Sequence, residues 1–255
     1  MNVAIVCVFI AKENILFMKE WIDYHKHIGV SRFYLYDNSK VQHSLGCHSK
    51  RKQYNPGQVN KYGINYDKLV NMSQQQIDEH KQCIVDDNGG DVVFYDWSPV
   101  GSTGQIMGGG PYQAQAYNDN LHTCKQDDVD WCCAIDMDEF IVLKSVGLKN
   151  FLNRLDAEIS HIKMKQVLFQ SRFDNIGKRV TDITSHWTKS ATGGYKNIYR
   201  VKDTSHVNIH KVAATGRQHV DDAIWFNHYK INKMSVPSHE FVYLDNITNK
   251  LPHNH

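Results

Sequence analysis

The sequence has few of the features that mark proteins outside the ordinary globular class. Its 255 residues include only 5 Pro and 16 Gly, with no internal repeat and no low-complexity tract, which excludes disordered and fibrous proteins. The 29 Lys and Arg against 27 Asp and Glu leave a net charge of +2, so no bulk electrostatic field favours nucleic acid or an anionic membrane. The length suits one sizeable core, and we expect a single domain over residues 1–255.

The sequence also lacks a long apolar run and paired cysteine spacing. Its longest apolar run, residues 3–11, is about half of the roughly 20 residues that a membrane-spanning helix needs. The six cysteines show no CxxC spacing, and several lie inside apolar runs, as small buried hydrophobic residues do. The N-terminal stretch shows no basic leader and no small-residue cleavage site. We therefore expect a soluble protein in a reducing, cytoplasmic setting, with no membrane span.

What the sequence does contain is an alternation of apolar strands and periodic helices. Residues 3–10 are predicted to form a strand, Asn14 could cap the following helix, and Gly29 supplies its left-handed stop. With a second strand at 32–36 this makes a βαβ unit, whose right-handed crossover brings both carboxyl ends to one edge of the sheet. Ligands of open α/β sheets bind at such an edge. The polar residues expected there are Lys12, Glu13, Asp37 and Asn38.

The rest of the chain continues this alternation and predicts a three-layer α/β/α sandwich with a mixed, mostly parallel sheet. Residues 39–65 are polar and without period, which indicates a long loop or insertion. The glycine-rich residues 98–104 and 108–111 lack the GxxxxGK[ST] order of a P-loop and are expected to form a flexible loop. Further helices are expected near 66–84, 111–126 and 148–159, strands near 92–95, 130–135, 164–169, 199 and 207–212, and a C-terminal tail from about 236 to 255.

The strand at 130–135 stops abruptly on three acids, Asp136, Asp138 and Glu139. Such crowding of like charge is costly unless something positive neutralises it. A hard divalent cation such as Mg²⁺ or Mn²⁺ binds carboxylate oxygens and shares them with a substrate diphosphate. A solvated acidic turn is the alternative, because a bare Asp-x-Asp often occurs by chance. The position directly after a buried strand favours the metal site.

Several segments together resemble a known enzyme family. Residues 5–14, 20–30 and 33–39, followed by 135–141, are similar in order and spacing to the GT-A glycosyltransferases related to families 2 and 92. Gln113, Ala116 and Tyr117 resemble the helix of that family ahead of the Asp-x-Asp strand. Its late His-Tyr-x-x-Lys-Ser element is resembled, with wider spacing, by Asn227, His228, Tyr229, Lys233 and Ser235. The chain is similar to the compact enzymes of this kind with which large DNA viruses decorate capsid glycoproteins, which would place it in the host cytoplasm.

This resemblance implies a GT-A fold with an antiparallel strand near the Asp-x-Asp edge. It implies transfer of a hexose or deoxyhexose from a nucleotide-diphosphate donor, a UDP-sugar, to a hydroxyl of a glycan or glycoprotein, with Mn²⁺ or Mg²⁺. The implied metal ligands are Asp136, Asp138 and His228, with His210 as a weaker rival for the last. The implied donor-binding residues are Ala11, Lys12, Glu13, Asp37, Asn38, Gln113, Asp136, Met137, Asp138 and Lys233.

Glycosyl transfer also needs a base, or in retaining enzymes another arrangement on the opposite face of the sugar. Asp221 and Asp222 are the first candidates for the base and Glu139 the second, although a helix N-terminus or a solvated turn explains Asp221 and Asp222 equally well. The cations that could neutralise the diphosphate are Lys12, Arg172 and Lys233.

Two other functions remain open from the sequence. One is a non-catalytic carbohydrate- or nucleotide-binding module of the same fold, because fold does not fix function. The other is a nucleotidyltransferase or phosphohydrolase that uses the same metal pair. Residues 11–14 lack the Gly- and Arg/Lys-rich first turn usual in nucleotide-sugar synthesis enzymes, and they also replace the more usual Lys-Asn-Glu order of the glycosyltransferases.

Overall fold

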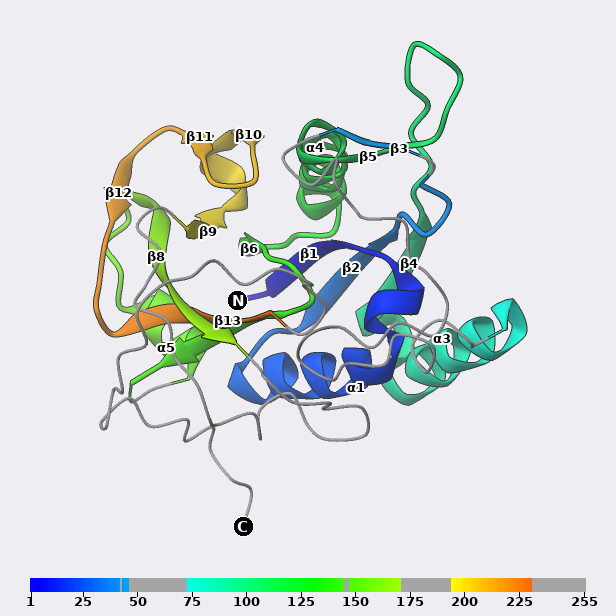
Figure 1. Cartoon of the computed structure of the whole chain (residues 1–255). Helices are drawn as coiled ribbons and strands as arrows, with labels where there is room; N and C mark the ends of the chain where they lie inside the picture. The colour runs from blue at the N-terminus through cyan, green and yellow to red at the C-terminus, as the bar shows by residue number, and fades with distance from the viewer. Residues whose placement is uncertain (42, 46–72, 145–146, 171–193, 231–255) are drawn as a thin grey trace.

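The computed structural model describes residues 1–41, 43–45, 73–144, 147–170 and 194–230 (Figure 1). Strands and helices alternate through the first half of the chain, and strands dominate the second. In chain order the elements are β1 (Val3–Phe9), α1 (Ala11–Ile28), β2 (Arg32–Asp37), β3 (His43–Leu45), α3 (Gln74–Asn88), η1 (Gly89–Asp91), β4 (Val92–Asp96), β5 (Met107–Gly109), α4 (Gly110–Gln126), β6 (Trp131–Ala134), β7 (Glu139–Leu143), α5 (Leu148–Asn153), β8 (Ile159–Gln170), β9 (Tyr195–Arg200), η3 (Val201–Asp203), β10 (Thr204–Val207), β11 (Val212–Ala214), β12 (Arg217–His219) and β13 (Ile224–Lys230).

The main sheet has the strand order β4-β2-β1-β6-β9-β8-β13-β7, with β12 paired to β8. β4, β2, β1 and β6 are mutually parallel. β9 is antiparallel to both β6 and β8, so β8 runs in the same direction as β6, and β12 and β13 follow β8. Among the described strands of this sheet, β9 and β7 alone run the other way. The predicted mixed, mostly parallel sheet is confirmed, as is an antiparallel strand beside the Asp-x-Asp strand.

Helices cover both faces of this sheet, which confirms the predicted α/β/α layers. In Figure 1, α1 and α3 lie below the sheet and α4 lies above it. Alternate residues of β1 face the two sides, as the pleat of a strand requires. Ile5 packs in the core with Trp21 of α1. Val6 packs in the other core with Tyr117 of α4.

The first βαβ unit is close to its prediction but begins its helix earlier. α1 starts at Ala11, with Ile10 as the N-cap residue, so the predicted cap at Asn14 is wrong. The Asn14 side chain accepts a hydrogen bond from the backbone N–H of Ile10 at 3.2 Å and lies in the first turn of the helix. Gly29 ends the helix with φ 115°, and its predicted left-handed stop is confirmed.

The glycine-rich stretch is partly ordered structure rather than loop. Met107–Gly109 forms β5, which pairs in parallel with β3, and α4 starts at Gly110 with Pro111 in its first turn, as predicted. A Cβ atom at Gly108 would stand 2.7 Å from the side-chain oxygen of Asn38, so this glycine permits a close approach of the two segments. The prediction of a flexible loop is therefore wrong for residues 108–110.

The predicted insertion at 39–65 is described only at its beginning. That part contains β3, and the hydroxyl of Ser39 accepts a hydrogen bond from the backbone N–H of Ala11 at 2.8 Å. The start of the predicted insertion is therefore part of the fold. Residues 42 and 46–72, which include most of the insertion and the start of the helix predicted at 66–84, lie outside the described residues, as does the predicted tail at 236–255.

Three further predictions need correction in the second half of the chain. The helix expected at 148–159 ends at Asn153, and β8 begins at Ile159. Within the strand expected at 207–212, residues 208–211 instead connect β10 to β11. β7, β12 and β13 had no clear period and were not predicted. None of the described helices has the length and apolar character needed to cross a membrane.

Candidate active site

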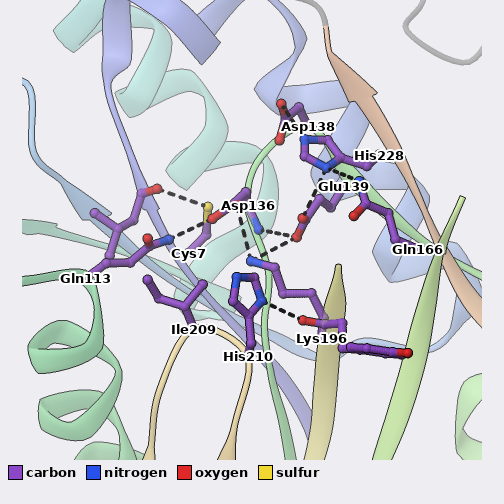
Figure 2. A network of polar contacts seen from close by, with 12 residues as sticks. Cys7, Gln113, Asp136, Asp138, Glu139, Gln166, Lys196, Ile209, His210 and His228 are labelled. Atoms are coloured by element: carbon purple, nitrogen blue, oxygen red, sulfur yellow. Dashed lines mark hydrogen bonds and ion pairs between the residues drawn. The ribbon is translucent and has the colours of Figure 1, made fainter. Parts of the chain in front are cut away.

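The acidic motif lies in the turn between β6 and β7, at the carboxyl edge of the parallel strands. The backbone N–H of Glu139 donates to the carbonyl of Asp136 at 3.0 Å, which closes the turn. β9 begins at this edge and contributes Lys196, while β8 and β13 end there and contribute Gln166 and His228. Figure 2 shows these side chains gathered around the acids. Four strands that are distant in sequence therefore supply one polar cluster.

Lys196 is the central cation of this cluster, and sequence reasoning missed it. Its Nζ lies 3.1 Å from Asp136 Oδ2 and 3.1 Å from Glu139 Oε2, and the residue is only 1% exposed. Burial lowers the pKa of Lys196, but the two carboxylates outweigh it and hold the pKa well above its ordinary value. The positive charge predicted for this acidic turn is thus supplied in part by a side chain of the protein. The sequence holds only a weak signal for it. In a strand, residues two apart share a face, so Lys196 lies on the same core-facing side of β9 as the apolar Ile198, where a lysine is unusual.

Asp136 has both carboxylate oxygens engaged. Lys196 binds Oδ2, and the side-chain amide of Gln113 in α4 donates to Oδ1 at 2.7 Å. Burial raises the pKa of Asp136, but the attraction of Lys196 outweighs it, so the net pKa lies below its usual value. Asp136 is therefore an ionised, fixed carboxylate.

Glu139 is the most deeply buried of the three acids, at 2% exposure. Its Oε2 accepts a hydrogen bond from the backbone N–H of Asp136 at 2.9 Å, in addition to the ion pair with Lys196. Burial raises the pKa of Glu139 to about 7 against the lowering effect of Lys196. A carboxylate enclosed in this way does not face an incoming acceptor. The geometry favours a positioning role for Glu139 over the role of base predicted for it.

The raised pKa of Glu139 predicts a pH dependence of stability. Between about pH 4.5 and about pH 7 Glu139 releases its proton in the unfolded chain and retains it in the folded protein, so its contribution to the free energy of unfolding falls as the pH rises through this window. Buried His25, whose pKa is lowered to about 3, contributes in the opposite direction below about pH 6.5, so the Glu139 contribution is seen as a difference between variants. The expected fall is on the order of 3 kcal/mol. Urea unfolding at several pH values measures it. Relative to the wild type, Glu139→Gln should make the slope of stability against pH more positive, and Glu158→Gln, at an exposed pair with Arg217, should leave it unchanged; equal slopes in both variants would contradict the assignment.

Asp138 and His228 form a second pair, next to the Lys196 cluster. His228 Nε2 lies 3.2 Å from Asp138 Oδ2, because Glu139 is paired in register with His228 between β7 and β13. The other ring nitrogen, Nδ1, lies 2.8 Å from the side-chain amide nitrogen of Gln166. If the amide of Gln166 turns, its oxygen accepts a hydrogen bond from Nδ1–H, and Nε2 then carries a lone pair. Asp138 and His228 then offer one oxygen and one nitrogen to a common ligand.

The predicted metal triad is only partly assembled. Within the described part of the chain, no group of three or more His, Cys, Asp and Glu side chains is arranged to hold a metal ion. Asp136 faces the ammonium of Lys196, which disfavours a second cation at the same oxygen. Asp138 and His228 do lie together, and a mixed oxygen and nitrogen pair suits Mn²⁺. These two residues fit a cation whose remaining ligands come from a diphosphate and water.

Asp37, Asn38 and Ala11, which were predicted to bind the donor, lie at the same edge but bond to other parts of the protein. The carboxylate of Asp37 binds the ammonium of Lys81 and the backbone N–H and hydroxyl of Ser39. The side-chain amide of Asn38 donates to the carbonyl of Trp97 at 2.8 Å, and Ala11 is buried. The structure thus gives these residues a supporting role at the edge of the sheet.

Most of the other residues predicted to bind the donor sugar nucleotide or its diphosphate lie outside what the structure describes. Met137 is buried in the turn, at 2% exposure. The side chains of Lys12 and Glu13 are outside what the structure describes, and Arg172 and Lys233 fall in segments that it does not describe. Their predicted roles stay predictions.

Asp221 and Asp222 lie away from the acidic cluster. They precede β13, where Ile224 pairs with Leu143, whereas His228 pairs with Glu139 at the other end of the same strands. The extended strand from Ile224 to His228 alone spans roughly 13 Å, so Asp221 and Asp222 lie well away from His228. The Asp221 side chain accepts a hydrogen bond from the N–H of Ala223 at 2.7 Å, and Asp222 pairs with Lys165 at the surface. The alternative of a solvated turn fits this placement, and a role as base does not.

The backbone of this chain is similar in arrangement to those of several solved structures. HddC from Yersinia pseudotuberculosis, complexed with GMP-PN, is 15% identical over 92% of this chain and 94% of that chain, with a TM-score of 0.38. TarS from S. aureus is 11% identical over 90% of this chain and 60% of that chain, with a TM-score of 0.41. A protein described as a glucose-1-phosphate thymidylyltransferase from Bacillus anthracis, in complex with sucrose, is 11% identical over 89% and 71% of the two chains, with a TM-score of 0.33.

No protein-family model matches the sequence, and no curated protein matches it. At these identities and TM-scores the likenesses to solved structures carry no argument about the reaction. The resemblance to glycosyltransferase families 2 and 92 and to viral enzymes therefore stays a prediction from the sequence. What can be argued about function comes from the site.

Proposed function

We propose that this protein is a metal-dependent glycosyltransferase that moves a sugar from a UDP-sugar to a hydroxyl of a glycan or glycoprotein. The observation that supports it is the facing pair of Asp138 and His228 at the carboxyl edge of the sheet, 3.2 Å apart and directly after a buried strand. Ligands of open α/β sheets bind at this edge. The choice of UDP and of the acceptor class rests on the sequence resemblance.

The side chains of the cluster divide the work of holding a nucleotide diphosphate. Asp138 and His228 would hold the cation, which when bound offsets the charge of the departing diphosphate. Lys196 holds Asp136 and Glu139 in place, so that the turn keeps its shape without the cation. Gln113 secures Asp136 from the side of α4. A site fixed in this way before the ligand arrives needs little rearrangement on binding.

Calorimetric titration with UDP, GDP and CMP, each with Mn²⁺ and with excess EDTA, tests this function. UDP binding that disappears with EDTA is expected, because the cation bridges the protein and the diphosphate. Release of UDP from a UDP-sugar separates glycosyl transfer from nucleotidyl transfer, which releases pyrophosphate or uses it. Binding of no nucleotide under any condition would contradict the proposal and favour a non-catalytic module.

Replacing His228 by Ala should weaken Mn²⁺ affinity by at least about tenfold, because the cation loses its nitrogen ligand. Nucleotide affinity measured in EDTA should change little. Both constants come from the same calorimetric titrations, with thermal melting to show that the variant is folded. His219→Ala is a matched control, since His219 lies on β12 near Asp221, and Asp221 lies away from the acidic turn between β6 and β7. An equal loss of Mn²⁺ affinity in the two variants would remove His228 from the site.

A further inference from the structure

A rigid hairpin tip lies over the candidate site. Residues 208–211 connect β10 to β11, and the N–H of Asn208 donates to the carbonyl of Lys211 at 2.7 Å. The side-chain oxygen of Asn208 accepts from the N–H of Ile209 at 2.7 Å. At the base of the tip, the amide of Asn118 in α4 bonds both the N–H and the carbonyl of Val207, at 2.9 and 2.8 Å. The tip is therefore held in one conformation against α4.

The hairpin tip contacts both elements that hold Asp136. The end of the Ile209 side chain lies 3.1 Å from the place of a Cβ atom on Gly110, one turn before Gln113 in α4. On the other side, Nδ1 of His210 lies 2.8 Å from the carbonyl oxygen of Tyr195, the residue before Lys196. Figure 2 shows the His210 ring beside the Lys196 side chain. The contact of Ile209 with α4 and the hydrogen bond of His210 to β9 thus place His210 at the edge of the acidic cluster.

The contact with Tyr195 sets the tautomer of His210. A carbonyl oxygen only accepts hydrogen bonds, so Nδ1 must carry the proton. In the neutral ring Nε2 then carries a lone pair. His210 is exposed, and within the described part of the chain Nε2 has no hydrogen-bond partner. An imidazole fixed in this way by its Nδ1–H is in the state that a base acting through Nε2 requires.

We propose that His210 is the general base that accepts the proton of the acceptor hydroxyl, an inference that rests on the proposed function. The hydroxyl oxygen bonds to the anomeric carbon of the donor sugar as its proton passes to Nε2. The bond from that carbon to the diphosphate oxygen breaks, and its electron pair leaves with the UDP. The imidazolium, exposed at the hairpin tip, then returns its proton to solvent. As a single displacement, this step inverts the anomeric carbon.

The carboxylates at this edge are less suited to the task. Glu139 is enclosed, and Asp136 is bound by Lys196 and Gln113. Asp138 faces His228 and would hold the cation. His210 combines exposure, a fixed tautomer and a position beside these residues, which none of the three acids does.

The test compares His210→Ala with the wild type and with His206→Ala, a matched control at another exposed histidine of the same hairpin. The measurements are UDP release and product formation from UDP-glucose, UDP-galactose and UDP-rhamnose, with water and with a panel of methyl hexosides as acceptors. His210→Ala should lower kcat by about 10²- to 10⁴-fold. Its Kd for UDP with Mn²⁺ should stay within about twofold of the wild type. Added imidazole should restore part of its activity and none to His206→Ala.

Four outcomes would overturn the proposal. A His210→Ala variant with near-normal kcat excludes the base while leaving the glycosyltransferase in place. A product that retains the anomeric configuration, seen by NMR, excludes the single displacement. If the wild type neither binds UDP nor releases it from any donor, the proposed function fails and the role of His210 fails with it. A loss of kcat with no rescue by imidazole and a changed melting temperature would assign His210 to structure alone.

Discussion

Replacing Lys196 by Met is expected to lower the free energy of unfolding by about 3–5 kcal/mol. The substitution keeps the length of the side chain but removes the ammonium that lies 3.1 Å from both Asp136 and Glu139. Glu139 is nearly fully buried and would keep only the ring of His228, 3.7 Å away, near its carboxylate. Asp136, about a third of whose side chain is exposed, can be partly hydrated. Most of the loss should therefore come from Glu139. Urea unfolding at pH 7.5 measures it.

Two further variants make this result specific. Lys165→Met, on the neighbouring strand β8, removes an exposed lysine that pairs with Asp222 at the surface, and should leave the urea midpoint close to that of the wild type. Adding Glu139→Gln to Lys196→Met should recover much of the loss, since the buried charge disappears with its partner. A Lys196→Met variant as stable as Lys165→Met would show that Lys196 does not neutralise the turn.

Replacing Asp138 by Ala is expected to abolish Mn²⁺-dependent donor turnover while leaving the fold intact. The Asp138 side chain is partly exposed, and its contact is with His228 rather than with the buried lysine. We expect UDP affinity in the presence of Mn²⁺ to fall at least about 100-fold, to the level measured in EDTA, which corresponds to about 2.7 kcal/mol. The melting temperature should change by no more than about 2 °C. Calorimetry and thermal melting on the same preparation separate the two effects.

The control for Asp138 is Asp222→Ala, which removes an exposed acid at the far end of β13. It should retain both affinity and turnover. Near-full activity of Asp138→Ala would place the cation site elsewhere. Full loss of activity in Asp222→Ala would restore this residue to the candidates for the base.

Local sequence patterns were sufficient to predict those secondary-structure features that depend on a few adjacent residues. The apolar run of β1, the left-handed Gly29 and the strand that ends at the acidic turn were all predicted, because each follows from a short stretch of sequence. The start of α1 was missed because Asn14 can bond the chain from inside the first turn as well as from its cap. The strand predicted at 207–212 was wrong because residues 208–211 form a hairpin tip, whose Ile209 packs with the core that α4 helps to form.

Proximity along the chain was misleading for the base. Asp222 is six residues from His228, and this suggested one site, but an extended strand carries neighbours apart by about 3.3 Å per residue. His210, by contrast, lies far from Asp136 in sequence and meets the cluster through the carbonyl of Tyr195. Contacts of this kind depend on the order of strands in the sheet.

By itself the sequence determined the layered α/β fold and the acidic turn after a buried strand, because both follow from local periodicity and from the pairing rules of parallel sheets. The tertiary structure decided which charges meet. It placed the buried Lys196 between Asp136 and Glu139, left Asp138 to face His228, and set Asp221 and Asp222 apart. These partners come from strands distant in the chain, and whether a charge is stabilised depends on register and burial, which no local pattern encodes.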